Sequence, residues 1–158
     1  MKTRFMFPHS WRLPAIVLLI PSSLAAAWLL FSNYEPAWFN WNLFVMHSDQ
    51  VFESPTRFGF IQDNVGLELF GTVVMISLII IGFSADRIED EFTLRLRYEA
   101  LTWATFVNYV VVILSIWLIY GLSFLYVLIF NLFFIMILFI MRYRYLIYRA
   151  GKTTDYEE

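Results

Sequence analysis

The chain has no cysteine, only two histidines, and charged residues at only 15% of its 158 positions. Without cysteine there is no disulfide, no thiolate chemistry and no thiol metal site. His9 and His47 are expected on opposite sides of a membrane, as the orientation argued below implies, so they cannot share a metal. His47 with Asp49 is a possible ligand pair, but two ligands do not make a zinc site. Neither a glycine-rich phosphate loop nor a nucleophile elbow is present. We therefore expect no catalytic residue, no metal site, no cofactor and no enzymatic activity.

Apolar residues take the place of the missing charge. Hydrophobic residues make up 60% of the chain and aromatic residues 20%. A soluble domain carries about 25% charged residues, and a globule of this size could not bury so much apolar surface. Four apolar runs come close to the roughly 20 residues that a membrane-spanning helix needs. They cover residues 13–31, 67–83, 100–119 and 122–141.

These runs predict α-helices, because a backbone in lipid must satisfy its own hydrogen bonds and the runs lack the alternation of barrel strands. The expected fold class is all-α: one integral-membrane domain, residues 1–158, built as a four-helix bundle. The short Tyr120-Gly121 connection should make the third and fourth helices antiparallel neighbours.

The first run has a competing interpretation as a cleaved signal peptide. Basic residues precede it, and Pro21 with three alanines at 25–27 resembles a cleavage region. The apolar run continues to Phe31, which favours a retained anchor. Pro21 should then kink the helix.

Basic residues predict the orientation of the spans. With the N-terminus inside, ten of the eleven basic residues lie in inner segments and only Arg57 lies outside, as the positive-inside rule requires. Both termini and the connection 84–99 are therefore expected on the inner side of the membrane. Residues 32–66 form the outer segment.

The outer segment is rich in aromatic residues, which favours a cap lying at the headgroup level over a sensing or docking face. Phe39, Trp41, Leu43 and Val45 alternate along the chain and suggest a short strand, with residues 58–61 as its partner. A short interfacial helix fits almost as well.

The connection 84–99 holds eight of the 24 charged residues. Asp86 followed by Glu89 has the spacing of a capping box, so the third helix is expected to begin at Arg87 and to extend into the cytoplasm. Ile88, Phe92 and Leu96 recur every four residues and form an apolar line beside the charges. They pack either on the protein itself or on a cytoplasmic protein partner. The predicted partner-binding residues are Ile88, Glu89, Asp90, Glu91, Phe92 and Leu96.

The fourth run ends in a basic and aromatic cluster. Its position beside the membrane favours anionic lipid headgroups over nucleic acid. The predicted headgroup-binding residues are Arg142, Arg144, Arg149 and Lys152. Membrane lipids and one cytoplasmic protein are thus the expected partners, and direct nucleic-acid binding is not expected. Whether identical chains associate stays open.

Three polar residues in the runs support an alternative function as a small transporter or channel subunit. Glu68, Asn108 and Asn131 would line its path. Pairing the last two helices about residues 121–122 separates the two amides by about 10 Å along the axis. Asn108 and Asn131 are therefore not expected to bond each other, and each should stabilise helix–helix packing through other partners.

The second half of the chain resembles a family of small four-helix bacterial inner-membrane proteins with an FSxDRxEDE-like cytoplasmic motif. The resemblance covers residues 82–148, while the first helix and outer segment match only as a span and a loop. Its positions are GFSADRIEDE at 82–91, LRLR at 94–97, Trp103, Asn108-Tyr109, Tyr120-Gly121, Phe124-Leu125, Asn131 and Arg142-Tyr143. The family has no characterised function. Its members are frequent neighbours of helix-turn-helix regulators, which implies that a transcription regulator is docked or regulated.

Overall fold

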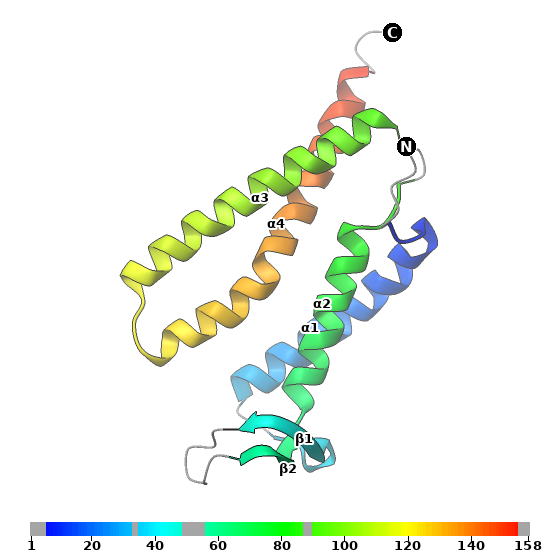
Figure 1. The fold of residues 1–158 in the computed structure, drawn as a ribbon. Helices are drawn as coiled ribbons and strands as arrows, with labels where there is room; N and C mark the ends of the chain where they lie inside the picture. The colour runs from blue at the N-terminus through cyan, green and yellow to red at the C-terminus, as the bar shows by residue number, and fades with distance from the viewer. Residues whose placement is uncertain (1–5, 33–34, 49–55, 87–89, 155–158) are drawn as a thin grey trace. The chain divides into compact units, whose positions relative to one another are not determined.

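The computed structural model describes residues 6–32, 35–48, 56–86 and 90–154. Within these ranges the chain forms four α-helices and one two-stranded antiparallel sheet (Figure 1). The helices are α1 (Arg12–Ser32), α2 (Gly66–Gly82), α3 (Glu91–Leu118) and α4 (Leu122–Thr154). The strands are β1 (Asn40–Ser48) and β2 (Thr56–Asn64), and the 3₁₀ turns η1 (His9–Trp11) and η2 (Ala37–Phe39) precede α1 and β1.

Each predicted run falls on one helix. The bounds of α1 and α2 match the prediction to within one residue, whereas α3 begins nine residues earlier and α4 ends thirteen residues later than the apolar runs. Three of them, α1, α3 and α4, are long and apolar enough to cross a membrane. The fourth, α2, has 17 residues, which lies at the lower limit for a spanning helix, about 17 residues. The structure therefore supports a membrane protein, while the four-span bundle with both ends inside stays a prediction.

The all-α prediction is wrong for the outer segment, because β1 and β2 pair as an antiparallel hairpin. The register places Leu43 opposite Ile61 and Phe44 opposite Phe60. The alternation of polar and apolar residues had suggested this strand and its partner. A β-hairpin pairs the facing backbone groups of its two strands and leaves those on its outer edges unpaired, so the segment need not be helical where water or headgroups can reach these edges.

Internal contacts divide the chain into two compact units, Leu18–Val74 and Met1–Val17 with Met75–Glu158. The first unit contains the hairpin. The second contains α3 and α4, which run antiparallel as predicted from their short connection (Figure 1). Gly121 lies in this connection with a φ of 71°, a conformation that glycine adopts without steric cost.

The core of the second unit lies between α3 and α4. Ala100 and Ala104 of α3 are fully buried against Phe139, Tyr143 and Leu146 of α4. Small side chains on one helix let a partner helix approach closely. The buried residues of α3 recur at spacings of three, four and seven, so they form one seam: Arg97, Ala100, Ala104, Asn108 and Ser115.

The third helix begins later than predicted. Its N-cap is Asp90, whose carboxylate accepts a hydrogen bond from the Thr93 backbone N–H at 2.8 Å. The Thr93 hydroxyl completes the capping box with the Asp90 N–H. Asp86 is therefore not the cap, since the Asp90–Thr93 pair satisfies the helix start. The helix still exceeds the hydrocarbon core, because 28 residues span about 42 Å against a core of about 30 Å.

Candidate functional site

The chain before α1 is bound to the connection between α2 and α3. The Phe7 backbone N–H donates to the Phe83 carbonyl at 3.1 Å, and the Ala85 N–H donates to the Phe7 carbonyl at 2.8 Å. The Ser84 hydroxyl donates to the Pro8 carbonyl at 3.1 Å. These bonds form a single parallel bridge between two segments far apart in the sequence.

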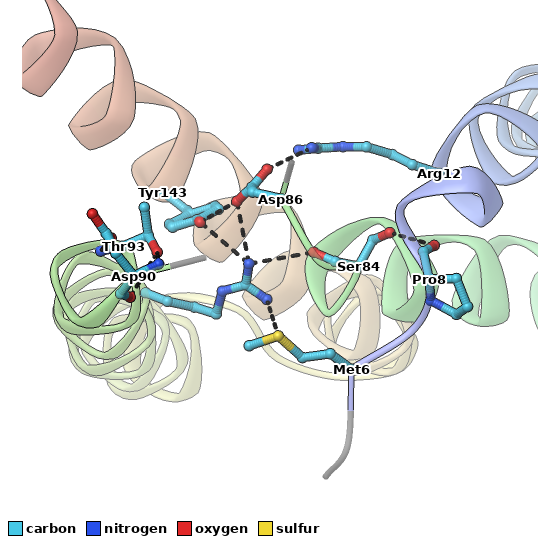
Figure 2. A network of polar contacts seen from close by, with 9 residues as sticks. Met6, Pro8, Arg12, Ser84, Asp86, Asp90, Thr93 and Tyr143 are labelled. Atoms are coloured by element: carbon cyan, nitrogen blue, oxygen red, sulfur yellow. Dashed lines mark hydrogen bonds and ion pairs between the residues drawn. The ribbon is translucent and has the colours of Figure 1, made fainter. Parts of the chain in front are cut away.

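Asp86 lies beside this bridge and receives donors from three helices (Figure 2). Arg12 of α1 places Nη1 2.9 Å from Asp86 Oδ1. Arg97 of α3 places Nη2 3.2 Å from Asp86 Oδ2, and the Tyr143 hydroxyl of α4 donates to the same oxygen. We name these residues, with Ser84, the Asp86 cluster.

Arg97 is the most buried member of the ion pairs, with 9% of its side chain exposed. Its Nη2 also donates to the Ser84 carbonyl at 3.3 Å and to the Tyr143 hydroxyl at 3.2 Å. The guanidinium lies 4.8 Å from the centre of the Tyr143 ring, a cation–π contact. Nη1 approaches the Met6 sulfur at 3.6 Å. The buried guanidinium of Arg97 is thereby stabilised by an ion pair, by hydrogen bonds and by the face of the Tyr143 ring.

The cluster keeps its carboxylate ionised. Burial acts to raise the pKa of Asp86, but hydrogen bonds from Tyr143 and Arg12 and the charges of Arg12 and Arg97 outweigh it. The pKa of Asp86 therefore lies below its usual value of 3.8. At the helix start nearby, the hydrogen bond from the Thr93 N–H likewise lowers the pKa of Asp90.

The predicted docking residues are in different environments. Ile88 and Glu89 lie outside the described residues. Asp90 and Glu91 are exposed, and Glu91 pairs with Arg95 at 3.6 Å on the helix surface. Phe92 is 54% exposed. Leu96 instead packs against the α3–α4 core. The predicted apolar line is therefore divided, because Leu96 contacts the protein itself while Phe92 is exposed.

The predicted headgroup-binding residues all lie on α4. Arg144 and Arg149 are exposed. Arg142 is partly enclosed: its Nη2 lies 3.4 Å from Glu99 Oε1, and its guanidinium lies over the Trp103 ring at 5.2 Å. Lys152 lies in the last turns of the helix, and its side chain is outside the described part of the structure.

Asn108 and Asn131 form a direct hydrogen bond, with Asn131 Nδ2 3.0 Å from Asn108 Oδ1. The predicted separation of about 10 Å, seven residues of helical rise, is wrong. The helices end at Leu118 and begin again at Leu122, so the connection is centred on Tyr120. The prediction had placed this centre at residues 121–122. A centre at Tyr120 brings the amides of Asn108 and Asn131 to nearly the same height along the paired helices.

Sequence reasoning missed the Asp86 cluster. Arg12 and Arg97 were counted only as inner basic residues, and Asp86 was taken for a helix cap. One signal was present: Arg97 continues the spacing of Ala100 and Ala104, which predicts that it shares their buried face. No comparable pattern links Arg12 or Tyr143 to Asp86.

The donors and the acceptor of the Asp86 cluster bind one another and so join segments from different parts of the chain. Among the described residues, no three histidine or carboxylate side chains gather in a way that could hold a metal ion. Comparison with protein-family models, curated proteins and solved structures found no match to this chain. The function must therefore be argued from the residues themselves.

Proposed function

We propose that this protein is a non-enzymatic, multi-pass protein of the bacterial inner membrane. In this proposal the first turn of α3, residues 90–92, docks a cytoplasmic protein and regulates it. The four spans place both termini and this turn inside, as the distribution of basic residues favours. Arg144 and Arg149, which are exposed on α4, would bind anionic headgroups at the same membrane face.

One observation carries the proposal: Ser84 and Asp86 are bound to other segments of the chain, whereas Asp90, Glu91 and Phe92 at the start of α3 are exposed. Asp86 is neutralised by Arg12 and Arg97, so it offers little charge to a partner. An exposed aromatic side chain with two carboxylates in a capped first helical turn is a suitable docking surface, since preorganised contacts lose less entropy on binding.

The chemistry of this tip indicates the kind of partner. An exposed phenylalanine needs an apolar pocket, and the neighbouring carboxylates favour basic residues around that pocket. A DNA-binding regulator has such a basic surface. This agrees with the role implied by the resemblance over residues 82–148, and we propose a transcription regulator as the partner.

A photo-crosslinking amino acid placed at Phe92 tests the proposal in intact bacterial membranes. We expect a discrete adduct with one cytoplasmic protein. The same substitution at Tyr98, which is 66% exposed on the same helix, is the matched control and should give no such adduct.

Substitutions that remove the negative charges of this turn then distinguish specific docking from chance contact. Glu91→Lys combined with Asp90→Ser removes both carboxylates, while serine still caps the helix. We expect this pair of changes to abolish the Phe92 adduct without altering the amount of inserted protein. An adduct that persists unchanged, or that forms equally from Tyr98, would contradict the proposal.

The transport alternative has less support. Asn108 and Asn131 satisfy each other, so neither amide is available to line a path without breaking that bond. Glu68 is exposed in the first turn of α2. Flux through liposomes that falls on Glu68→Gln would restore this alternative.

A further inference from the structure

One face of the outer hairpin carries exposed apolar side chains next to the exposed Asn42 and Gln62. Phe44, Met46, Phe58 and Phe60 are 60%, 71%, 70% and 77% exposed. Phe44 and Met46 alternate along β1, and Phe60 pairs with Phe44, so these three side chains share one side of the sheet. Phe58 has a φ of 52°, outside the extended range, so alternation does not assign its side chain to a face. The rings of Phe44 and Phe60 lie directly across from each other, with centroids 5.5 Å apart.

The other side of the hairpin is different. Leu43, Val45 and Ile61 on that side are only partly exposed. Trp41 and Asp63 face each other across the strands, and both are exposed. Three of the four most exposed apolar side chains described in the hairpin are therefore gathered on one face. Large exposed apolar patches mark surfaces that another apolar phase covers.

The base of the hairpin is fixed to its helices. Only Val65 separates β2 from α2, and its backbone N–H donates to the Phe39 carbonyl at 3.0 Å. Asn64 accepts from the Gly66 N–H at 3.1 Å and donates to the Pro36 carbonyl at 2.9 Å. A Cβ added at Gly66 would lie 3.1 Å from Leu29 of α1 and 3.3 Å from Phe39. The base of the hairpin thus adjoins the start of α2 and lies close to Leu29 of α1.

The attachment of the hairpin to apolar helices indicates what covers its exposed apolar face. We propose that the hairpin lies along the membrane and inserts the face of Phe44, Met46 and Phe60 into the interfacial layer of the adjacent leaflet. The occupant is lipid, because the patch is uncharged and aromatic and is joined to apolar helices at the depth where aromatic side chains concentrate. Trp38 of η2, which is 79% exposed at the hairpin base, extends the same aromatic belt.

The absence of cysteine makes the chain suitable for a site-specific test. Single variants Phe44→Cys and Phe60→Cys, each carrying a nitroxide label, are reconstituted in vesicles of zwitterionic and anionic phospholipid. Collision rates with oxygen, which concentrates in lipid, and with a water-soluble nickel chelate are measured. Asp63→Cys is the matched control on the opposite face, and Leu125→Cys, at an exposed position of α4, is the lipid reference.

We expect oxygen to dominate at positions 44 and 60, as at position 125, and the nickel chelate to dominate at position 63. Nickel-dominated collisions at 44 and 60 would overturn the proposal, because the face would then lie in water. Spin–spin broadening at position 60 that disappears on dilution with unlabelled chain would also overturn it, because a second copy would then cover the face. Neither result depends on partner docking at α3.

Discussion

Arg12 and Asp86 are 74 positions apart in the chain, yet Arg12 Nη1 and Asp86 Oδ1 lie 2.9 Å apart. This pair joins the start of α1 to the connection between α2 and α3. Arg97 and Tyr143 bring α3 and α4 to the same carboxylate. One aspartate therefore connects four segments of the chain, and its removal should affect all of them.

Replacing Asp86 with asparagine should destabilise the protein by about 3 kcal/mol, because it leaves the largely buried Arg97 without its countercharge. The free energy of unfolding in detergent can be followed by tryptophan fluorescence. Asp63→Asn, at an exposed aspartate, is the control and should change stability by less than about 0.5 kcal/mol. Equal effects of the two changes would show that the Asp86 cluster contributes no special stability.

The contribution of Asp86 should depend on pH. Its pKa is lowered in the folded protein, so its stabilisation is fully present above the usual value of 3.8 and is lost as the pH falls through the folded-state pKa. The stability difference between wild type and Asp86→Asn should therefore be constant near neutral pH and shrink below pH 3.8. The lowered pKa of Asp90 affects both proteins equally and cancels. A difference that persists unchanged into strong acid would refute this assignment.

The hydrogen bond between Asn108 and Asn131 predicts a coupling energy. Asn108→Leu or Asn131→Leu alone leaves the partner amide unsatisfied and should cost about 1–2 kcal/mol, whereas the double variant should cost less than the sum. A double-mutant cycle in bicelles should give a coupling of about 0.6 to 2 kcal/mol. Additive effects would mean that the two amides act separately.

Gly82 lies close to α4, which predicts intolerance of a side chain. An added Cβ would lie 2.9 Å from Met136 Cε and 3.1 Å from the Phe139 ring. Gly82→Ala should therefore destabilise by about 1–3 kcal/mol, and by less in a Met136→Ala background. Gly151→Ala is the control, because nothing lies within 4 Å of its added Cβ. Thermal unfolding should show no loss there, and an equal loss at both glycines would contradict the packing argument.

The helices were predictable because their signal is local. A continuous apolar run must be helical in lipid, so each run gave a helix with bounds within a few residues, except at the start of α3 and the end of α4. At those ends the apolar signal stops while the helix continues: α3 begins nine residues before residue 100, and α4 continues to Thr154. Alternating residues around Leu43 likewise suggested the strand, but not the full extent of the hairpin.

The contacts were less predictable because they depend on register. A shift in the centre of one connection was enough to turn two distant amides into a hydrogen-bonded pair. The cap of α3 was also mispredicted: Asp86 had the spacing of a capping box with Glu89, but the cap is Asp90, whose box is completed by Thr93.

By itself, the sequence determined that the surrounding solvent is lipid and where the four helices lie. It did so through apolar runs of membrane-spanning length, their short connections and the distribution of basic residues. Only the tertiary structure decided that Asp86 is an internal countercharge while Asp90 remains at the surface. The physical reason is that a carboxylate pairs with the donors that lie near it in space, however far apart they are in the sequence. Arg12, Arg97 and Tyr143 reach Asp86 only after the N-terminal segment, α3 and α4 have packed together.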